Sequence, residues 1–264
     1  MREVSMISIR KQTILTAVLL IALACILSNA FAGSAGMTEG AETAQSILEK
    51  ADEIRFPRES FQVDVTIKTT SSESLAEKRT FRVLSKGNEN SIVMTTEPAS
   101  ERGQTMLMRG RDLWIFMPNV SQPIRLSLSQ RLTGQVANGD IARANFSGDY
   151  NPELLGTDRI DEKDYYILEL IARDRSVTYQ KVVLWVQKSN YWPYRAEFYS
   201  LSNRLIKTAH YENFQMILGQ LRPARLIMQD ELRKEEISVL DYFQMELRDL
   251  PDKIFTKNYL KRIE

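Results

Sequence analysis

The spacing of apolar residues changes near residue 60 from a helical to an extended period. Between Ala41 and Ile54, apolar side chains recur every three or four positions, which predicts a helix with one buried stripe that ends before Pro57. From Ser60 the period becomes two, which is typical of a strand with one buried and one solvated face. The apolar positions of this first strand are Phe61, Val63, Val65 and Ile67.

The same alternation predicts about ten or eleven further strands. They are expected over residues 79–84, 91–96, 105–108, 112–117, 123–126, 165–172, 179–187, 195–200, 205–211, 221–229 and 236–245. Turns between neighbouring strands are predicted at Gly87-Asn88, Gly110-Arg111 and Ser202-Asn203. Pro223 predicts an edge strand or a bulge, because proline has no N–H to donate to a strand ladder.

The alternation stops between Ser129 and Ser147. This segment is predicted to form one or two short helices with a loop, in which Asp140 caps a helix over residues 141–146. Another short helix is expected after Pro251. Many meandering strands with a helical insert predict a mainly β fold, in which a single antiparallel sheet curls onto itself. No linker divides residues 41–264, so we expect one domain, preceded by a flexible segment over residues 33–40.

The first 32 residues have the three parts of a secretory signal peptide. Arg2, Arg10 and Lys11 precede an uncharged apolar run over residues 14–27, and a small-x-small site ends at Ala32. The run is too short to span a bilayer comfortably, since spanning takes about 20 residues. We therefore expect export to the periplasm with cleavage after Ala32. The alternative is an uncleaved N-terminal anchor.

The only cysteine, Cys25, offers another interpretation of the same segment. Ala22-Leu23-Ala24-Cys25 partly resembles a lipobox, whose cysteine would be acylated and would tether the protein. However, Ala22 replaces the usual leucine, and Cys25 lies inside the apolar run rather than after it. We favour cleavage after Ala32, which leaves a chain without cysteine and therefore without disulfides.

The chain that remains lacks the residue types on which most catalysis depends. His210 is the only histidine and lies in a strand pattern, which disfavours a Ser-His-Asp triad, and with no mature cysteine a histidine or cysteine zinc site is also disfavoured. No phosphate-binding loop or dinucleotide motif is present. We expect no enzyme activity, no cofactor and no metal. A hydrolase that uses acid pairs such as Asp161-Glu162 is the least favoured alternative.

The charge of the mature chain gives no reason to expect nucleic acid as a partner. The whole chain has 35 basic and 34 acidic residues, of which three and one lie in the first 32, so the mature chain carries a net charge of −1. A near-neutral protein exerts no general electrostatic attraction on nucleic acid or on an anionic membrane.

Large apolar side chains in the predicted strands indicate what the sheet can hold. Methionine and aromatic residues accept irregular apolar partners, and a curled sheet closed by an insert can enclose a cavity for an acyl chain. The alternative is that these side chains fill an ordinary core. The candidates for an apolar, concave lipid-binding face are Phe61, Val63, Val65, Phe81, Met94, Trp114, Phe116, Trp185 and Phe198.

The chain resembles the outer-membrane lipoprotein-sorting protein family, to which LolA and LolB belong. The resemblance is carried by Asp112 to Pro118, Ile124 to Ser127, Gln130 to Gln135 and Asn138 to Phe146, with support from Leu184-Trp185-Val186 and Ala196 to Tyr199. It implies a strongly curved, half-open antiparallel β-barrel covered by a helical lid. Proteins of this kind hold acyl chains in an apolar concave face.

The resemblance implies a periplasmic carrier that binds lipid acyl chains or lipoproteins and moves them toward the outer membrane. Its partners would be an inner-membrane transporter and an outer-membrane acceptor, and we expect a monomer. The alternative is an accessory or docking subunit of a membrane export system without its own lipid cargo.

Four polar residues of the insert have two interpretations. They either latch the lid or contact a lipid headgroup or a partner, or they only satisfy the backbone of an irregular segment, which we favour. They are Arg131, Asp140, Arg143 and Asn145.

Overall fold

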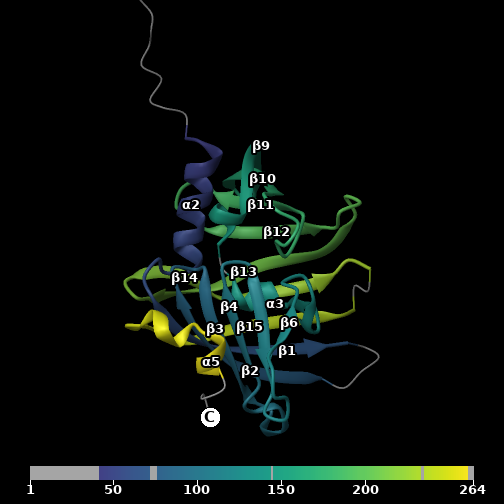
Figure 1. Cartoon of the computed structure of the whole chain (residues 1–264). Coiled ribbons are helices and arrows are strands. Elements are labelled where there is room, and N and C mark those ends of the chain that lie inside the picture. Colours follow the sequence, from purple (N-terminus) through teal and green to yellow (C-terminus); the bar gives the residue numbers. More distant parts are fainter. Residues whose placement is uncertain (1–41, 72–75, 144, 233–234, 261–264) are drawn as a thin grey trace, which may run out of the picture. The chain divides into compact units, whose positions relative to one another are not determined.

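A 13-stranded antiparallel sheet is the main element of the structure, which is a computed structural model (Figure 1). The structure describes residues 42–71, 76–143, 145–232 and 235–260. The described residues from Thr43 to Leu260 belong to one compact unit. The predicted signal peptide, the flexible segment over residues 33–40 and the alternative role of Cys25 lie outside the described residues. A mainly β fold with few helices is confirmed.

The order of the strands shows how the chain builds the sheet. It runs β6-β5-β4-β3-β2-β1-β15-β14-β13-β12-β11-β10-β9. The chain therefore travels from the centre to one edge, crosses to the other edge and returns, so that the first and last strands pair in the middle. The strands are β1 (Phe61–Thr70), β2 (Glu77–Lys86), β3 (Asn90–Glu97), β4 (Thr105–Arg109), β5 (Asp112–Phe116), β6 (Ile124–Leu126), β9 (Tyr150–Ile160), β10 (Lys163–Ala172), β11 (Lys181–Gln187), β12 (Pro193–Tyr199), β13 (Leu205–Ile217), β14 (Gln220–Asp230) and β15 (Ile237–Leu247).

The predicted N-terminal helix is present as α2 (Ala44–Arg55). Its first turn is capped by Thr43, whose hydroxyl accepts a hydrogen bond from the Ser46 N–H at 3.1 Å. At the other end, the Arg222 guanidinium donates to the backbone carbonyls of Glu53 and Ile54. The apolar stripe is buried, with Ile47, Leu48 and Ala51 fully covered. These contacts satisfy one of the free N–H groups at the start of the helix and two of the free carbonyls at its end.

The segment between the two sheet edges, here called the insert, spans residues 127–149. It contains the two expected short helices, α3 (Asn138–Ala142) and α4 (Phe146–Asp149), but also an unpredicted hairpin of β7 (Arg131–Thr133) and β8 (Val136–Ala137). Asp140 lies in the first turn of α3, and its carboxylate accepts from the Ala137 N–H at 2.8 Å. The prediction of a single helix over residues 141–146 is wrong, because α3 ends at Ala142.

Strand β9 was not predicted, and β14, which was predicted at nearly the right residues, is not the edge strand that Pro223 suggested. Strand β9 is an edge strand whose side chains are mostly exposed, so it lacks the alternation by which a half-buried strand is recognised. Strand β14 contains Pro223 yet lies inside the sheet. It pairs with β15 only over Arg225–Gln229, so Pro223 lies beyond that ladder and no N–H is needed there.

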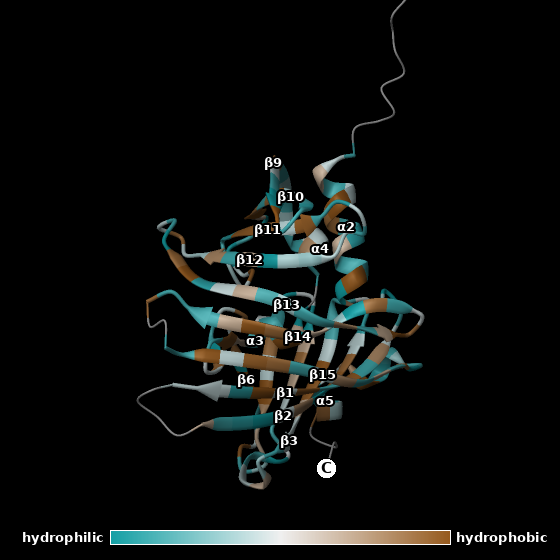
Figure 2. Cartoon of the chain, turned by 180° about the vertical axis from the view of Figure 1, so that it is seen from behind, coloured by the Kyte–Doolittle hydropathy of each residue, from teal (hydrophilic) through white to brown (hydrophobic). Residues whose placement is uncertain are grey.

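The predicted hairpin turns are confirmed by the strand registers. Gly87 and Asn88 both have positive φ, 61° and 54°, and join β2 to β3. Gly110, with φ of 58°, joins β4 to β5. Figure 2 shows apolar and polar segments alternating along the central strands, as a two-faced sheet requires.

The two faces of the sheet are covered by different parts of the chain. The main core lies on the face where α2 and the insert pack, here called the insert face. On the opposite face, β2 to β5 are covered by the C-terminal segment, which includes a 3₁₀ turn (Asp252–Ile254) and α5 (Lys257–Leu260). The helix predicted after Pro251 is thus present. No helix among the described residues has both the length and the apolar character needed to cross a membrane.

Candidate ligand-binding face

Three hollows with several apolar side chains in their walls lie on the insert face. The rim groove lies over β2 to β6, the apolar lobe lies over β1 and β2, and the polar lobe lies between the end of α2, the insert and β12 to β15. The volume open to the centre of a water molecule is about 360 Å³ in the rim groove, 30 Å³ in the polar lobe and 20 Å³ in the apolar lobe. One water needs roughly 10–15 Å³ on this measure, so the two lobes are nearly filled while the groove is open.

Apolar side chains from successive strands form the floor of the rim groove. Met106, Ile115 and Ile124 are register partners across β4, β5 and β6, and they make one row across the strands. Phe81 of β2 extends this floor, and Leu132 of β7 lines the groove from the insert. Ile124 remains 45% exposed, so part of the floor faces solvent.

The rim of the groove is polar. Arg79 donates to Glu101 at 2.9 Å and to the Leu132 carbonyl at 3.4 Å. Arg131 lies farther out, with its side chain 61% exposed and 3.9 Å from Glu236. An apolar floor with a charged rim is the pattern of a site that holds an apolar chain and leaves its polar end near water.

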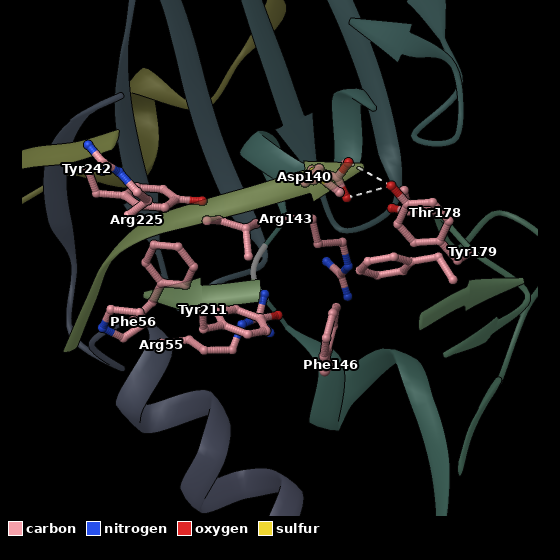
Figure 3. Close-up of a pocket in the computed structure, with 15 residues that line it drawn as sticks. Arg55, Phe56, Asp140, Arg143, Phe146, Thr178, Tyr179, Tyr211, Arg225 and Tyr242 are labelled. Carbon is pink, nitrogen blue, oxygen red and sulfur yellow. Dashed lines mark hydrogen bonds between the residues drawn. The ribbon is translucent and has the colours of Figure 1, made fainter. Parts of the chain in front are cut away.

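The polar lobe is built around Arg55, the last residue of α2 (Figure 3). Its Nη1 donates to Asp52 at 2.9 Å, and Asp52 in turn accepts from the Ser147 N–H at 2.7 Å. The guanidinium carbon lies 3.9 Å from the centre of the Phe146 ring and 5.9 Å from that of Tyr211. These contacts join α2 to α4 of the insert and hold the guanidinium at the cavity.

Two other polar groups of the lobe are held by partners on the insert. Tyr179 donates its hydroxyl to the Asp140 carboxylate, at 2.6 Å from Oδ2, as the dashed lines in Figure 3 show. Arg143 donates to the Asp149 carboxylate through two of its nitrogens, and to the Gly110 carbonyl at 2.7 Å. Arg143 is therefore fully occupied by the protein itself.

Burial sets the protonation of these groups. It raises the pKa of the Asp52 carboxyl, although the adjacent Arg55 charge opposes the shift. It also raises the pKa of Tyr179 well above its usual value, with the Asp140 charge adding to the effect, and raises that of Tyr211 despite nearby Arg55. For Arg55, burial acts to lower the pKa, but Tyr211 and Asp52 raise it overall. The tyrosines are thus neutral donors beside a charged guanidinium.

The structure brings together only part of the predicted apolar face. Phe61, Val63 and Val65 line the apolar lobe, Phe81 lines the rim groove and Phe198 lines the polar lobe. The other four lie elsewhere. Met94, Trp114 and Phe116 pack under the C-terminal segment on the opposite face, and Trp185 belongs to a separate cluster with Tyr165 and Val183. These four do not share a site with the first five.

The polar residues predicted in the insert are also divided. Asp140 and Arg143 line the polar lobe, and Arg131 lines the rim groove. Asn145 caps α4, where its side-chain oxygen accepts from the Gly148 N–H at 2.9 Å. Whether any of them contacts a ligand stays a prediction.

Sequence reasoning missed the residues that complete the polar lobe. Arg55, Phe56 and Tyr242 come from a helix end, a loop and a strand, and nothing in their local pattern connects them. The Phe56-Pro57 pair after a helical stripe marks a chain reversal, which is the only local signal that could have drawn attention to the end of α2.

Within the described residues, no three histidine, cysteine, aspartate or glutamate side chains are grouped so that they could hold a metal ion. The polar lobe contains arginine and tyrosine donors and a single carboxylate, Asp140. Such a set is suited to binding an acceptor group and not a cation.

Comparison with known proteins identifies the family. A solved structure of a LolA superfamily protein, NE2245 from Nitrosomonas europaea, is 70% identical over 83% of this chain and 100% of its own, with a TM-score of 0.81. The chain therefore belongs to the LolA superfamily. A family model described only as an uncharacterized protein matches residues 87–262. None of the curated proteins matches.

Two more distant structures share the fold. A domain from Vibrio parahaemolyticus, provisionally named an outer membrane lipoprotein-sorting protein, is 20% identical over 83% of this chain and 98% of its own, with a TM-score of 0.70. A DUF1329 family protein from Desulfovibrio piger is 22% identical over 83% of this chain and 100% of its own, with a TM-score of 0.69. At these identities the likeness concerns the fold alone.

Proposed function

We propose that this protein is a non-catalytic periplasmic carrier that binds the acyl chains of lipids or lipoproteins and moves them toward the outer membrane. The observation that carries the proposal is the rim groove, an open hollow with an apolar floor on the face where α2 and the insert pack. Membership of the LolA superfamily supports it. The finer architecture that goes with it is a curved half-barrel with the insert and α2 as a lid.

The rim groove offers a chain the apolar contact that drives binding. Each buried methylene of a ligand contributes about 0.8 kcal/mol, so a chain lying along Met106, Ile115 and Ile124 gains several kcal/mol without any polar contact. The two lobes are nearly filled, so the groove is where a chain first finds room.

The predicted signal peptide supports a periplasmic location, and cleavage after Ala32 would leave the carrier free to move. Acylation at Cys25 would instead tether it. An inner-membrane transporter would deliver the cargo and an outer-membrane acceptor would take it. The protein would act as a monomer.

An aspartate on the groove floor tests the proposal. Ile124→Asp should weaken the binding of a fluorescent 16-carbon fatty acid at least tenfold, because a carboxylate buried against a chain loses hydration without a partner. Ile124 is 45% exposed, so the variant should fold. The matched control is Leu201→Asp, at a 78% exposed turn position, which should bind like the unmodified protein.

The result against the proposal would be no binding by the unmodified protein, or equal affinity in both variants. The docking-subunit alternative has its own support in an exposed apolar hairpin tip, where Met216 is 68% and Leu218 is 40% exposed. It is favoured if Ile124→Asp abolishes lipid binding but leaves the protein active in cells.

A further inference from the structure

We propose that the polar lobe binds the carboxylate of a single-chain amphiphile, with Arg55 as its charged anchor and the chain running toward the rim groove. The assignment rests on the proposed carrier function and names the ligand class within it: a long-chain carboxylic acid, ionised at neutral pH.

The first observation is an unused donor. Arg55 is 9% exposed, and its Nε is buried with no hydrogen-bond partner among the described residues, while Nη1 is taken by Asp52. Buried polar atoms are rarely left without partners, so an unpaired N–H on an arginine that lines a cavity points to an acceptor that the protein does not itself provide. Figure 3 shows Arg55 reaching from the end of α2 toward Tyr211.

The second observation is the charge of the lining. Two buried arginines, Arg55 and Arg143, line the lobe together with one acidic residue, Asp140. Arg143 is held by Asp149, which does not line the cavity, whereas the Arg225 side chain is 41% exposed, pairs with Asp241 and adds no buried charge. The cavity wall is therefore rich in donors and poor in acceptors, which suits an anion.

Asp140 does not block an incoming carboxylate. Its oxygens already accept from the Tyr179 hydroxyl at 2.6 Å and from the Ala137 N–H at 2.8 Å. A carboxylate at Arg55 therefore meets a negative charge that is partly neutralised by donors. Tyr211 and Tyr242 add hydroxyl groups to the lining, and burial raises the pKa of both, so they stay protonated.

The size of the lobe selects the head group. The volume of the polar lobe that is open to the centre of a water molecule is about 30 Å³. At roughly 10–15 Å³ for each water, it holds about two or three water molecules. A carboxylate can replace two waters with its two oxygens. A phosphate brings more oxygens and is too large unless Phe56 or Phe146 moves.

The apolar lobe provides the path for the chain. It shares Phe56, Asp140 and Tyr242 with the polar lobe, and its other walls include Val63 and Val65. Val65 is in turn the register partner of Phe81, which lines the rim groove. A chain with its head at Arg55 thus passes over β1 and β2 into the groove, displacing the side chains of α3 that fill the apolar lobe.

The test compares head groups on one chain length, by displacement of a fluorescent 16-carbon probe at pH 8. Hexadecanoic acid should bind at least tenfold tighter than its methyl ester, because a hydrogen bond to a charged group is stronger than one to a neutral group. It should also bind tighter than hexadecyl phosphate. Tyr242→Phe should reduce the preference for the acid severalfold, whereas Tyr259→Phe, at a 36% exposed position, should leave it unchanged.

A second measurement is made first on the unmodified protein. In the complex with hexadecanoic acid labelled with ¹³C at the carboxyl, the chemical shift should titrate at a lower pH than that of the free acid, because Arg55 favours the ionised form. Arg55→Gln should remove that shift if the variant folds.

Equal affinity for acid and ester, an unshifted titration, or tighter binding of the phosphate would overturn the carboxylate assignment and leave the carrier function standing. Failure of every 16-carbon ligand to bind would overturn both.

Discussion

Arg143 shows how much a single buried ion pair can hold at the scale of a residue. Its side chain is 5% exposed and that of Asp149 is 6% exposed, and Arg111 approaches the same carboxylate at 3.1 Å. The pair links the insert to the β4–β5 turn through the Gly110 carbonyl. Removing Arg143 leaves the buried Asp149 carboxylate with only the partly exposed Arg111 as an ionic partner, and incomplete pairing of a buried charge is costly.

Replacing Arg143 should therefore destabilise the fold strongly. Arg143→Ala is expected to lower the free energy of unfolding by about 3–5 kcal/mol, measured by urea denaturation. Arg125→Ala breaks the exposed pair with Asp112, whose side chains are 72% and 49% exposed, and should cost about 0–1 kcal/mol. Similar losses in both variants would show that the Arg143 pair is not the structural clamp described.

At the scale of an element, the insert is fixed to the sheet by its β7–β8 hairpin. Gly134 occupies the turn with φ of 49° and lies against Thr69 and Ser238, whose hydroxyls are 2.9 Å apart. The Ser238 hydroxyl also accepts from the Gln135 N–H at 2.9 Å. The hairpin therefore sits on β1 and β15, and a side chain at residue 134 has no space.

Gly134→Ala should destabilise the protein more than a glycine replacement with the same backbone strain elsewhere. A Cβ at Gly134 would overlap the Thr69 and Ser238 side chains, whereas one at Gly87, with φ of 61°, meets nothing within 4 Å. Left-handed backbone costs about 1–2 kcal/mol in both variants, and the overlap adds about 1–3 kcal/mol at Gly134 only. Equal unfolding free energies would place the hairpin away from the sheet.

At the scale of the whole molecule, the two faces of the sheet are covered by different parts of the chain. The insert face contains the three hollows, while the opposite face of β2 to β5 is covered by Leu250, Ile254, Phe255 and Leu260. Trp114 belongs to this second core, where Lys257 lies 4.1 Å from its ring centre. The described part of the C-terminal segment thus packs against the sheet and lines none of the three hollows.

Replacing a large side chain of the C-terminal segment by alanine should lower stability without changing ligand affinity. Phe255 is 2% exposed, so Phe255→Ala should lower the free energy of unfolding by about 3–5 kcal/mol. Its affinity for the 16-carbon probe should not change under conditions where it is folded. A parallel loss of affinity would mean that the two faces are coupled. Tyr259→Ala, at a 36% exposed position, serves as the stability control.

Much of the fold could be predicted because it depends on local pattern. The apolar residues Val63, Val65 and Ile67 correctly predicted strand β1, and Gly87-Asn88 forms the predicted hairpin turn. The expected solvated face of β1 was wrong, because Asp64 and Thr66 are buried too. Strand β9 could not be found this way, since an edge strand exposed along most of its length has no reason to alternate. The β7–β8 hairpin is too short to show a period.

By itself, the sequence determined where most strands lie, where their hairpins turn and that α2 has one buried stripe, since these depend on neighbours a few positions apart. Only the tertiary structure decided which apolar residues share a face. Phe81 and Met94 both lie in alternating strands, yet one lines the rim groove and the other packs under the C-terminal segment. Alternation shows that a strand has two faces, but which segment covers each face depends on contacts between residues more than a hundred positions apart.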